Sequence, residues 1–148
     1  MGPSANNDVC PENDKVGENI NNTAHSMGRY GLRIFHNMVP RRFPCRSMPY
    51  DSTNPDDPYW MNPAITANFD NFVGWKNNRN GAIAERVGDV RFNNMKTADN
   101  LLAGIEFSLT GDLIGEYAQI NGALVIGKTN NTDYILEAKS PHGIITSR

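Results

Sequence analysis

The hydrophobic residues of this chain occur in short runs, separated by Asn, Gly and Pro residues that favour turns. The runs lack the period of about 3.6 residues that marks an amphipathic helix. Residues 1–19 are polar and show no apolar period, so we expect an irregular lead-in there. Residues 37–63 contain six prolines, which exclude a central strand or a helix from most of that stretch. The pattern therefore predicts short strands and one long Pro-rich excursion loop.

From residue 64 onward the pattern repeats. The segment Phe69–Glu85 aligns with the segment Phe92–Ser108 at a constant offset of 23 residues. Aromatic, amide and glycine positions coincide in this alignment: Phe69 with Phe92, Asn71 with Asn94, Asn77 with Asn100, and Gly81 with Gly104. A repeat of this length is typical of proteins that stack one supersecondary unit on the next.

Two fainter copies of the unit flank this pair. The segment Leu124–Glu137 aligns with Phe72–Glu85 at an offset of 52 residues, which places Val125 on Val73. The segment Asn22–Ile34 carries the same order of Asn, polar turn, Gly and aliphatic residues, with a small insertion. The chain therefore contains about four repeat units.

Short strands, Asn at the turns and units of this length predict an all-β fold, a parallel β-helix (solenoid) that occupies residues 20–148 with the loop 37–63 inserted. Because the sequence shows no polar cap, we expect a fragment of a longer solenoid. Asn residues at matching positions are expected to stack as ladders. The aliphatic residues expected in the core are Val73, Ile83, Met95, Ile105, Leu124 and Ile135. The alternative is a β-sandwich in which two hairpins resemble each other by coincidence.

The overall charge and hydropathy exclude two classes of partner. A net charge of -2 and a pI of about 5.9 provide no basic footprint for nucleic acid. No run approaches the roughly 18 apolar residues that span a bilayer, so we expect no direct membrane insertion by this segment.

Two local features point to an extracellular location. Asn21 and Asn130 each begin an Asn-x-Thr sequence, the acceptor pattern for N-glycosylation, although such patterns also arise by chance in an Asn-rich chain. The two cysteines, Cys10 and Cys45, permit one disulfide; the alternative is a pair of free buried thiols.

A stretch rich in arginine provides the candidate binding site. The segment Met27–Tyr50 contains five arginines, several aromatic residues and no acidic residue. Guanidinium groups bind carboxylates and sulfates through two parallel hydrogen bonds, and aromatic faces stack on sugar rings, so we expect an acidic glycan such as hyaluronan. The candidate residues are Arg29, Arg33, Arg41, Arg42, Arg46, Tyr30 and His36. The alternative is a solvated basic loop whose arginines pair with Asp51, Asp56 and Asp57.

The sequence contains no catalytic signature. It has no phosphate-binding glycine loop, no nucleophile elbow and no metal-ligand spacing. The acidic segment Asp51–Asp57 lacks the spacing of a calcium-binding loop and is typical of a Pro-rich turn. Glu85 and Glu137 share a repeat position, but surface carboxylates do so in any regular solenoid. We therefore predict no catalytic residue, no metal site and no cofactor.

Three segments carry a family resemblance. They are GPSANNDVCPENDKVGENINNTAHSMGRYGLRIF (Gly2–Phe35), PAITANFDNFVGWKNNRNGAIAERVGDVRFNNMKTADNLLAGIE (Pro63–Glu106) and NGALVIGKT (Asn121–Thr129). In this order they resemble the β-helix region of the fibrocystin-L family. They are more distantly similar to the cell-migration-inducing hyaluronan-binding protein and the transmembrane hyaluronidase.

The resemblance implies a right-handed parallel β-helix in the extracellular part of a large membrane-anchored or secreted protein. The expected function is that of a non-catalytic structural or adhesive rod, which binds acidic glycans or extracellular proteins at the cell surface. The alternative is part of a β-helix enzyme that depolymerises hyaluronan. No catalytic residue of the hyaluronan-degrading relatives matches a position in this sequence.

Overall fold

The computed structural model describes residues 10–45, 62–108, 118–131 and 142–146. These ranges contain strands, turns and bends but no helix. The described residues therefore include no helix that is long and apolar enough to cross a membrane. The strands are β1 (Thr23–His25), β2 (Leu32–Met38), β3 (Ala67–Asp70), β4 (Val73–Trp75), β5 (Asn80–Val87), β6 (Val90–Ala98), β7 (Ala103–Ser108), β8 (Gln119–Ile126) and β9 (His142–Thr146).

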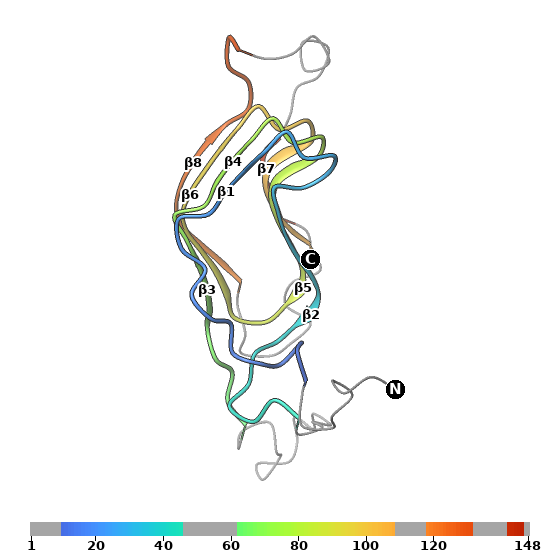
Figure 1. Ribbon diagram of the computed structural model, residues 1–148, viewed down its shortest axis with the longest axis vertical. Helices are drawn as coiled ribbons and strands as arrows, with labels where there is room; N and C mark the ends of the chain where they lie inside the picture. Colours follow the sequence, from blue (N-terminus) through green and yellow to red (C-terminus); the bar gives the residue numbers. More distant parts are fainter. Residues whose placement is uncertain (1–9, 46–61, 109–117, 132–141, 147–148) are drawn as a thin grey trace.

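The strands form two open sheets that face each other (Figure 1). Sheet A contains β1, β4, β6, β3 and β8, and sheet B contains β2, β5, β7 and β9. The chain alternates between them, so that four rungs follow in order: β1 with β2, then β3 and β4 with β5, then β6 with β7, then β8 with β9. Every pairing between these strands is parallel, which the alternative of two similar hairpins does not allow.

The strand register confirms the 23-residue repeat. Phe69 pairs with Phe92, and Ala82 pairs with Ile105. The predicted register of the last rung is wrong by one residue. Val125 was expected at the position of Val73, which pairs with Lys96, but Val125 pairs with the next residue, Thr97.

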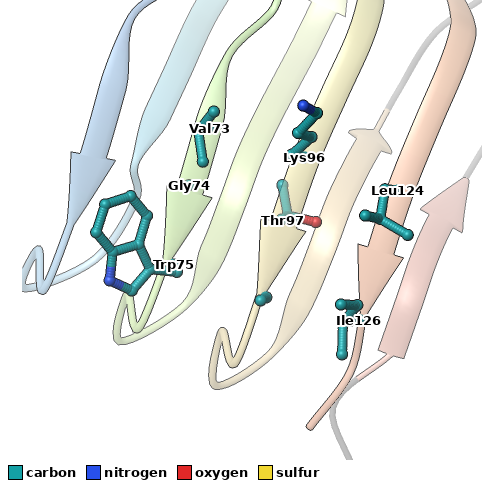
Figure 2. A pocket seen from close by; sticks show the side chains of 8 residues that line it. Val73, Gly74, Trp75, Lys96, Thr97, Leu124 and Ile126 are labelled. Atoms are coloured by element: carbon teal, nitrogen blue, oxygen red, sulfur yellow. The ribbon is translucent and has the colours of Figure 1, made fainter. Parts of the chain in front are cut away.

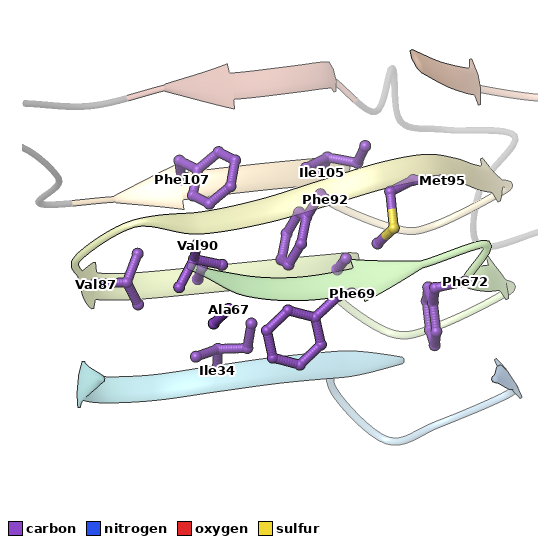
Figure 3. Close-up of a cluster of buried hydrophobic side chains, with 12 residues drawn as sticks. Ile34, Ala67, Phe69, Phe72, Val87, Val90, Phe92, Met95, Ile105 and Phe107 are labelled. Atoms are coloured by element: carbon purple, nitrogen blue, oxygen red, sulfur yellow. The ribbon is translucent and has the colours of Figure 1, made fainter. Parts of the chain in front are cut away.

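Aromatic and aliphatic side chains fill the space between the sheets (Figure 3). The ring of Phe92 lies edge-on to Phe69, with centroids 5.9 Å apart, and stacks on Phe107 at 4.9 Å. Met95 and Ile105 are fully buried, as predicted. Such packed side chains each contribute about 1.5–3 kcal/mol through burial.

Two residues predicted for the core lie on the outer face instead. Val73 and Leu124 are both paired with exposed Lys96, and Leu124 is 56% exposed. The cause is a left-handed residue two positions before each of them, Asn71 (φ 55°) before Val73 and Gly122 (φ 71°) before Leu124, which interrupts the in-out alternation of a strand. Ile83 is buried but pairs with Arg33 and Glu106 rather than joining the central cluster. The last predicted core residue, Ile135, lies outside the described residues.

Hydrogen bonds from Asn side chains link equivalent turns of successive rungs and form an amide ladder, as the sequence predicts. Oδ1 of buried Asn100 accepts hydrogen bonds from the backbone N (3.1 Å) and Nδ2 (2.9 Å) of Asn77. Nδ2 of Asn100 donates to the carbonyl oxygen of Gly74, and Oδ1 of Asn77 accepts from the backbone N of Met27. These bonds join three rungs, and the side chains of Asn77 and Asn100 that make them are buried.

The lead-in covers the first rung. Within 10–19 there is no strand; Val16 packs against the core, and the carbonyls of Glu12 and Asn13 accept hydrogen bonds from Val39 and Arg41. Cys10 and Cys45 form a disulfide with 5.3 Å between their Cα atoms, which settles the choice between a disulfide and free thiols. The loop predicted at 37–63 begins slightly later, because β2 extends to Met38; its residues 46–61 lie outside the described part of the chain.

Removing the amide of Asn100 tests the ladder. We expect Asn100→Ala to lower the free energy of unfolding by about 2–4 kcal/mol, because it leaves buried donors and acceptors without partners. Urea denaturation followed by circular dichroism measures this change. The control is Asn121→Ala on the exposed edge, where one hydrogen bond to Asn93 is lost and a change of about 0.5 kcal/mol is expected. Equal losses for the two variants would contradict the buried ladder.

A second prediction concerns the close approach of rungs at Gly81. A Cβ there would lie 2.6 Å from the carbonyl oxygen of Gly104 and 2.8 Å from Nδ2 of Asn100. We expect Gly81→Ala to destabilise the fold by about 1–3 kcal/mol through overpacking. Gly28→Ala is the matched control, since no heavy atom lies within 4 Å of its added Cβ. Thermal melting of both variants gives the comparison, and a Gly81→Ala melt like that of the native chain would refute the rung spacing.

Candidate functional site

A basic and aromatic cluster lies on the outer face of sheet B and in the turns that precede β2 and β5. Its members are Arg29, Tyr30, Arg33, Phe35, Arg79 and Glu85, and we call it the Tyr30 cluster. The rungs bring its parts together, since the backbone N of Arg79 donates to the carbonyl of Arg29 at 2.7 Å. Residues separated by 50 positions in the sequence thus become neighbours.

Arg33 is held in a fixed orientation at the centre of this cluster. Its Nε and Nη2 donate to Oε2 of Glu85 at 3.1 and 3.0 Å. Its Cζ lies 3.9 Å from the ring centroid of Phe35 and 4.9 Å from that of Tyr30. Contacts of a guanidinium with ring faces are favourable, and they orient the N–H groups of the side chain. The predicted partners of the arginines, Asp51, Asp56 and Asp57, lie outside the described residues.

The cluster carries an excess of positive charge. Arg79 approaches Tyr30 as well, with Cζ 5.5 Å from the ring centroid. Arg29 and Arg79 are exposed, whereas the single carboxylate of the cluster, Glu85, is bound to Arg33. The exposed guanidinium groups can bind a carboxylate or sulfate, and the exposed ring of Phe35 beside them can contact a sugar ring of the same ligand.

The other predicted binding residues are not part of this cluster. Arg41 is only 6% exposed and its backbone pairs with Ala64, so its side chain is not a surface feature. Arg42 is exposed and lies over the ring of Phe43, at 5.4 Å from its centroid. The seven residues of β2 separate Tyr30 from these arginines by about 23 Å of extended chain. His36 lies in β2 but its side chain is outside the described part, as is all of Arg46.

Sequence reasoning missed Arg79, although a signal for it was present. Arg79 lies outside the arginine-rich segment, and only the repeat alignment of Asn22–Ile34 with the later units places it beside Arg29. Glu137, which shares the repeat position of Glu85 in the sequence, lies outside the described residues. The structure instead gives Glu85 the role of orienting Arg33.

The two predicted glycosylation sites are accessible at their asparagines. Asn21 is exposed and has a left-handed backbone (φ 58°), and its Oδ1 accepts a hydrogen bond from Nδ2 of Asn71 at 3.2 Å. Asn130 is exposed in the turn after β8, while Thr132 of its acceptor pattern lies outside the described residues.

The outer face of sheet A carries a second surface feature, a shallow apolar groove of about 200 Å³ (Figure 2). Trp75, Leu124 and Ile126 line it, and the exposed side chain of Lys96 lies along it. His25 stacks on Trp75 with ring centroids 4.6 Å apart and an interplanar angle of 15°. The groove suits an uncharged group, and it faces away from the Tyr30 cluster because the two lie on different sheets.

Comparison with known proteins gives two groups of relatives. The chain is 32% identical to human fibrocystin-L and 31% identical to the mouse protein, in each case over 125 residues that make up 84% of the chain. It is 29% identical over 137 residues to the human cell surface hyaluronidase CEMIP2, with 82% of the chain and 9% of that protein covered. No family model matches the chain, and no solved structure matches it.

The matched region is a small part of these proteins, since the chain spans about 3% of the length of the fibrocystin-L sequences. The similarity nevertheless covers most of the chain and agrees with the resemblance carried by its short motifs. The chain is therefore fibrocystin-L-like, related to a short segment of fibrocystin-L and more distantly to a segment of the cell surface hyaluronidase CEMIP2.

Proposed function

We propose that the chain is a segment of a right-handed parallel β-helix, which serves as a non-catalytic structural or adhesive rod in a larger extracellular protein. The observation that carries this proposal is the common register of the rungs, in which Gly31, Gly81 and Gly104 follow one another in a column. Columns of like residues allow each rung to pack on the next in the same way. A structure of this kind extends by adding rungs and presents long side faces for binding.

An extracellular location is supported by three independent features. The disulfide between Cys10 and Cys45 suits an oxidising compartment. Asn21 and Asn130 are exposed and begin acceptor patterns for N-glycosylation. One relative, CEMIP2, is named as a cell surface protein.

The Tyr30 cluster is the proposed binding site for an acidic glycan, with hyaluronan as the first candidate. Arg29 and Arg79 supply exposed guanidinium groups, and Arg33 is oriented between Tyr30 and Phe35. Hyaluronan carries a carboxylate on alternate sugars, which such groups bind through paired hydrogen bonds. The printed name of CEMIP2, a hyaluronidase, supports the choice of ligand.

Glycan binding is tested by titrating labelled hyaluronan oligosaccharides into the chain and measuring fluorescence anisotropy. Relative to the native chain, we expect the double variant Arg29→Gln/Arg79→Gln to bind more than about tenfold more weakly, because two guanidinium–carboxylate contacts are lost. Binding should also weaken as salt is raised, since the contacts are solvent-exposed. Lys96→Gln on the other sheet is the control for the loss of positive charge, and it should bind like the native chain.

Three outcomes contradict this site assignment. They are a native chain that does not bind, a Lys96→Gln variant as weak as the arginine variant, and equal binding of a neutral oligosaccharide of the same length. A decrease in the size of high-molecular-weight hyaluronan during incubation would contradict the non-catalytic role and support the alternative of a depolymerising enzyme.

A separate prediction concerns the compartment. When the chain is secreted from animal cells behind a signal peptide, peptide mass spectrometry should find Cys10 linked to Cys45 and glycans on Asn21 and Asn130. An Asn21→Gln/Asn130→Gln variant should run at the mass of the unmodified chain. Free thiols together with unmodified asparagines in the native chain would refute the extracellular assignment.

A further inference from the structure

The apolar groove on the outer face of sheet A has a small residue at its floor and larger residues at its walls (Figure 2). Trp75, Ala98 and Ile126 occupy one column of paired positions on β4, β6 and β8. The methyl group of Ala98 therefore lies between two much larger side chains. Because neighbouring strands are about 4.8 Å apart, β4 and β8 are separated by about 10 Å, which leaves room for one apolar side chain over β6.

Lys96 is the one charged residue among those that line the groove. It precedes Ala98 by two residues in β6, so both side chains leave the same face of the sheet, about 6.6 Å apart along the strand. Its side chain is exposed, and within the described ranges no carboxylate forms an ion pair with it. Its paired neighbours, Val73 and Leu124, are apolar. An unpaired ammonium group beside an apolar groove is complementary to a partner that joins an apolar group to an anionic one.

The spacing of these two features matches an extended polypeptide. Side chains at positions i and i+2 of an extended segment leave the same face about 6.6 Å apart, as those of Lys96 and Ala98 do. An apolar side chain over Ala98 thus brings an acidic side chain, two residues away, beside Lys96. A free lipid fits less well, because the groove is shallow and its volume of about 200 Å³ is below the roughly 300–1,000 Å³ of pockets that enclose a small ligand.

We propose that the groove is a docking site for an extended segment of another protein, in which an apolar residue and an Asp or Glu stand two positions apart. The apolar side chain lies over Ala98 between Trp75 and Ile126, and the carboxylate pairs with Lys96. Tryptophan and contiguous exposed apolar surface are both features of protein interfaces. Further rungs after β8 would continue the sheet and leave the groove open, since side chains of the outer face point away from the sheet.

The inference is independent of glycan binding, because the groove and the Tyr30 cluster lie on different sheets. It is tested by titrating a blocked peptide, Gly-Phe-Gly-Asp-Gly, into the complete isotope-labelled chain and following the backbone amide resonances up to millimolar concentration. We expect saturating shifts at Lys96, Ala98 and Ile126, and none at Tyr30. The peptides Gly-Phe-Gly-Asn-Gly, which lacks the charge, and Gly-Phe-Asp-Gly-Gly, which changes the spacing, should each bind more than about threefold more weakly.

Two variants locate the contact. Ala98→Leu fills the floor of the groove and should weaken binding of the Asp peptide more than about tenfold, because the added side chain takes the space of the bound one. Lys96→Gln should abolish the difference between the Asp and Asn peptides. Lys15→Gln, in the exposed lead-in, is the control for the loss of positive charge and should keep that difference. Unchanged amide resonances in β5 and β7 separate a loss of binding from unfolding.

The proposal fails on any of three results. They are a native chain whose groove residues do not respond to the Asp peptide, an Ala98→Leu variant that binds this peptide like the native chain, and equal binding of the two peptides that differ in spacing. Responses of the groove residues to hyaluronan oligosaccharides or to octanoate, with none to the peptide, would overturn it as well and assign the groove to a glycan or a lipid.

Discussion

Parallel pairing of each rung on the next is the constraint on which the rest of the structure depends. It places residues of the same repeat position about 4.8 Å apart, so every side chain must suit the equivalent residues above and below it. The ring of Phe92 accordingly lies edge-on to that of its paired residue Phe69, and the amide of Asn77 bonds to that of Asn100. The same constraint explains why a column of glycines persists where one added carbon would meet the next backbone.

The sequence predicts this arrangement where the same residue type recurs at equal spacing. It does not predict the direction of a side chain that depends on the conformation of the backbone. The offset of 23 and the Asn77–Asn100 ladder follow directly from like residues at equal spacing. The outward direction of Val73 could not be read from hydrophobicity, because the left-handed residue Asn71 changes the side-chain alternation. The buried position of Arg41 was likewise hidden, since a run of arginines resembles an exposed surface.

The columns also determine what the outer faces can do. Turns that stack bring Arg29 beside Arg79, and a paired strand supplies Glu85 to orient Arg33, so the basic surface is assembled from two rungs. The opposite sheet presents an apolar groove beside Trp75 in the same way. The stacked rungs thus place a basic cluster on one outer face and an apolar groove on the other, while aromatic and aliphatic side chains fill the core.

The most direct test of this account is the pairing of strands in solution, measured by nuclear Overhauser effects between backbone protons. The account predicts contacts between paired residues of successive rungs, such as Val73 with Lys96, Lys96 with Leu124, and Ile105 with Ile144. These contacts should show the spacing of parallel strands. Antiparallel contacts between strands that follow each other in sequence, such as β6 with β7, would indicate hairpins and contradict the stacked rungs.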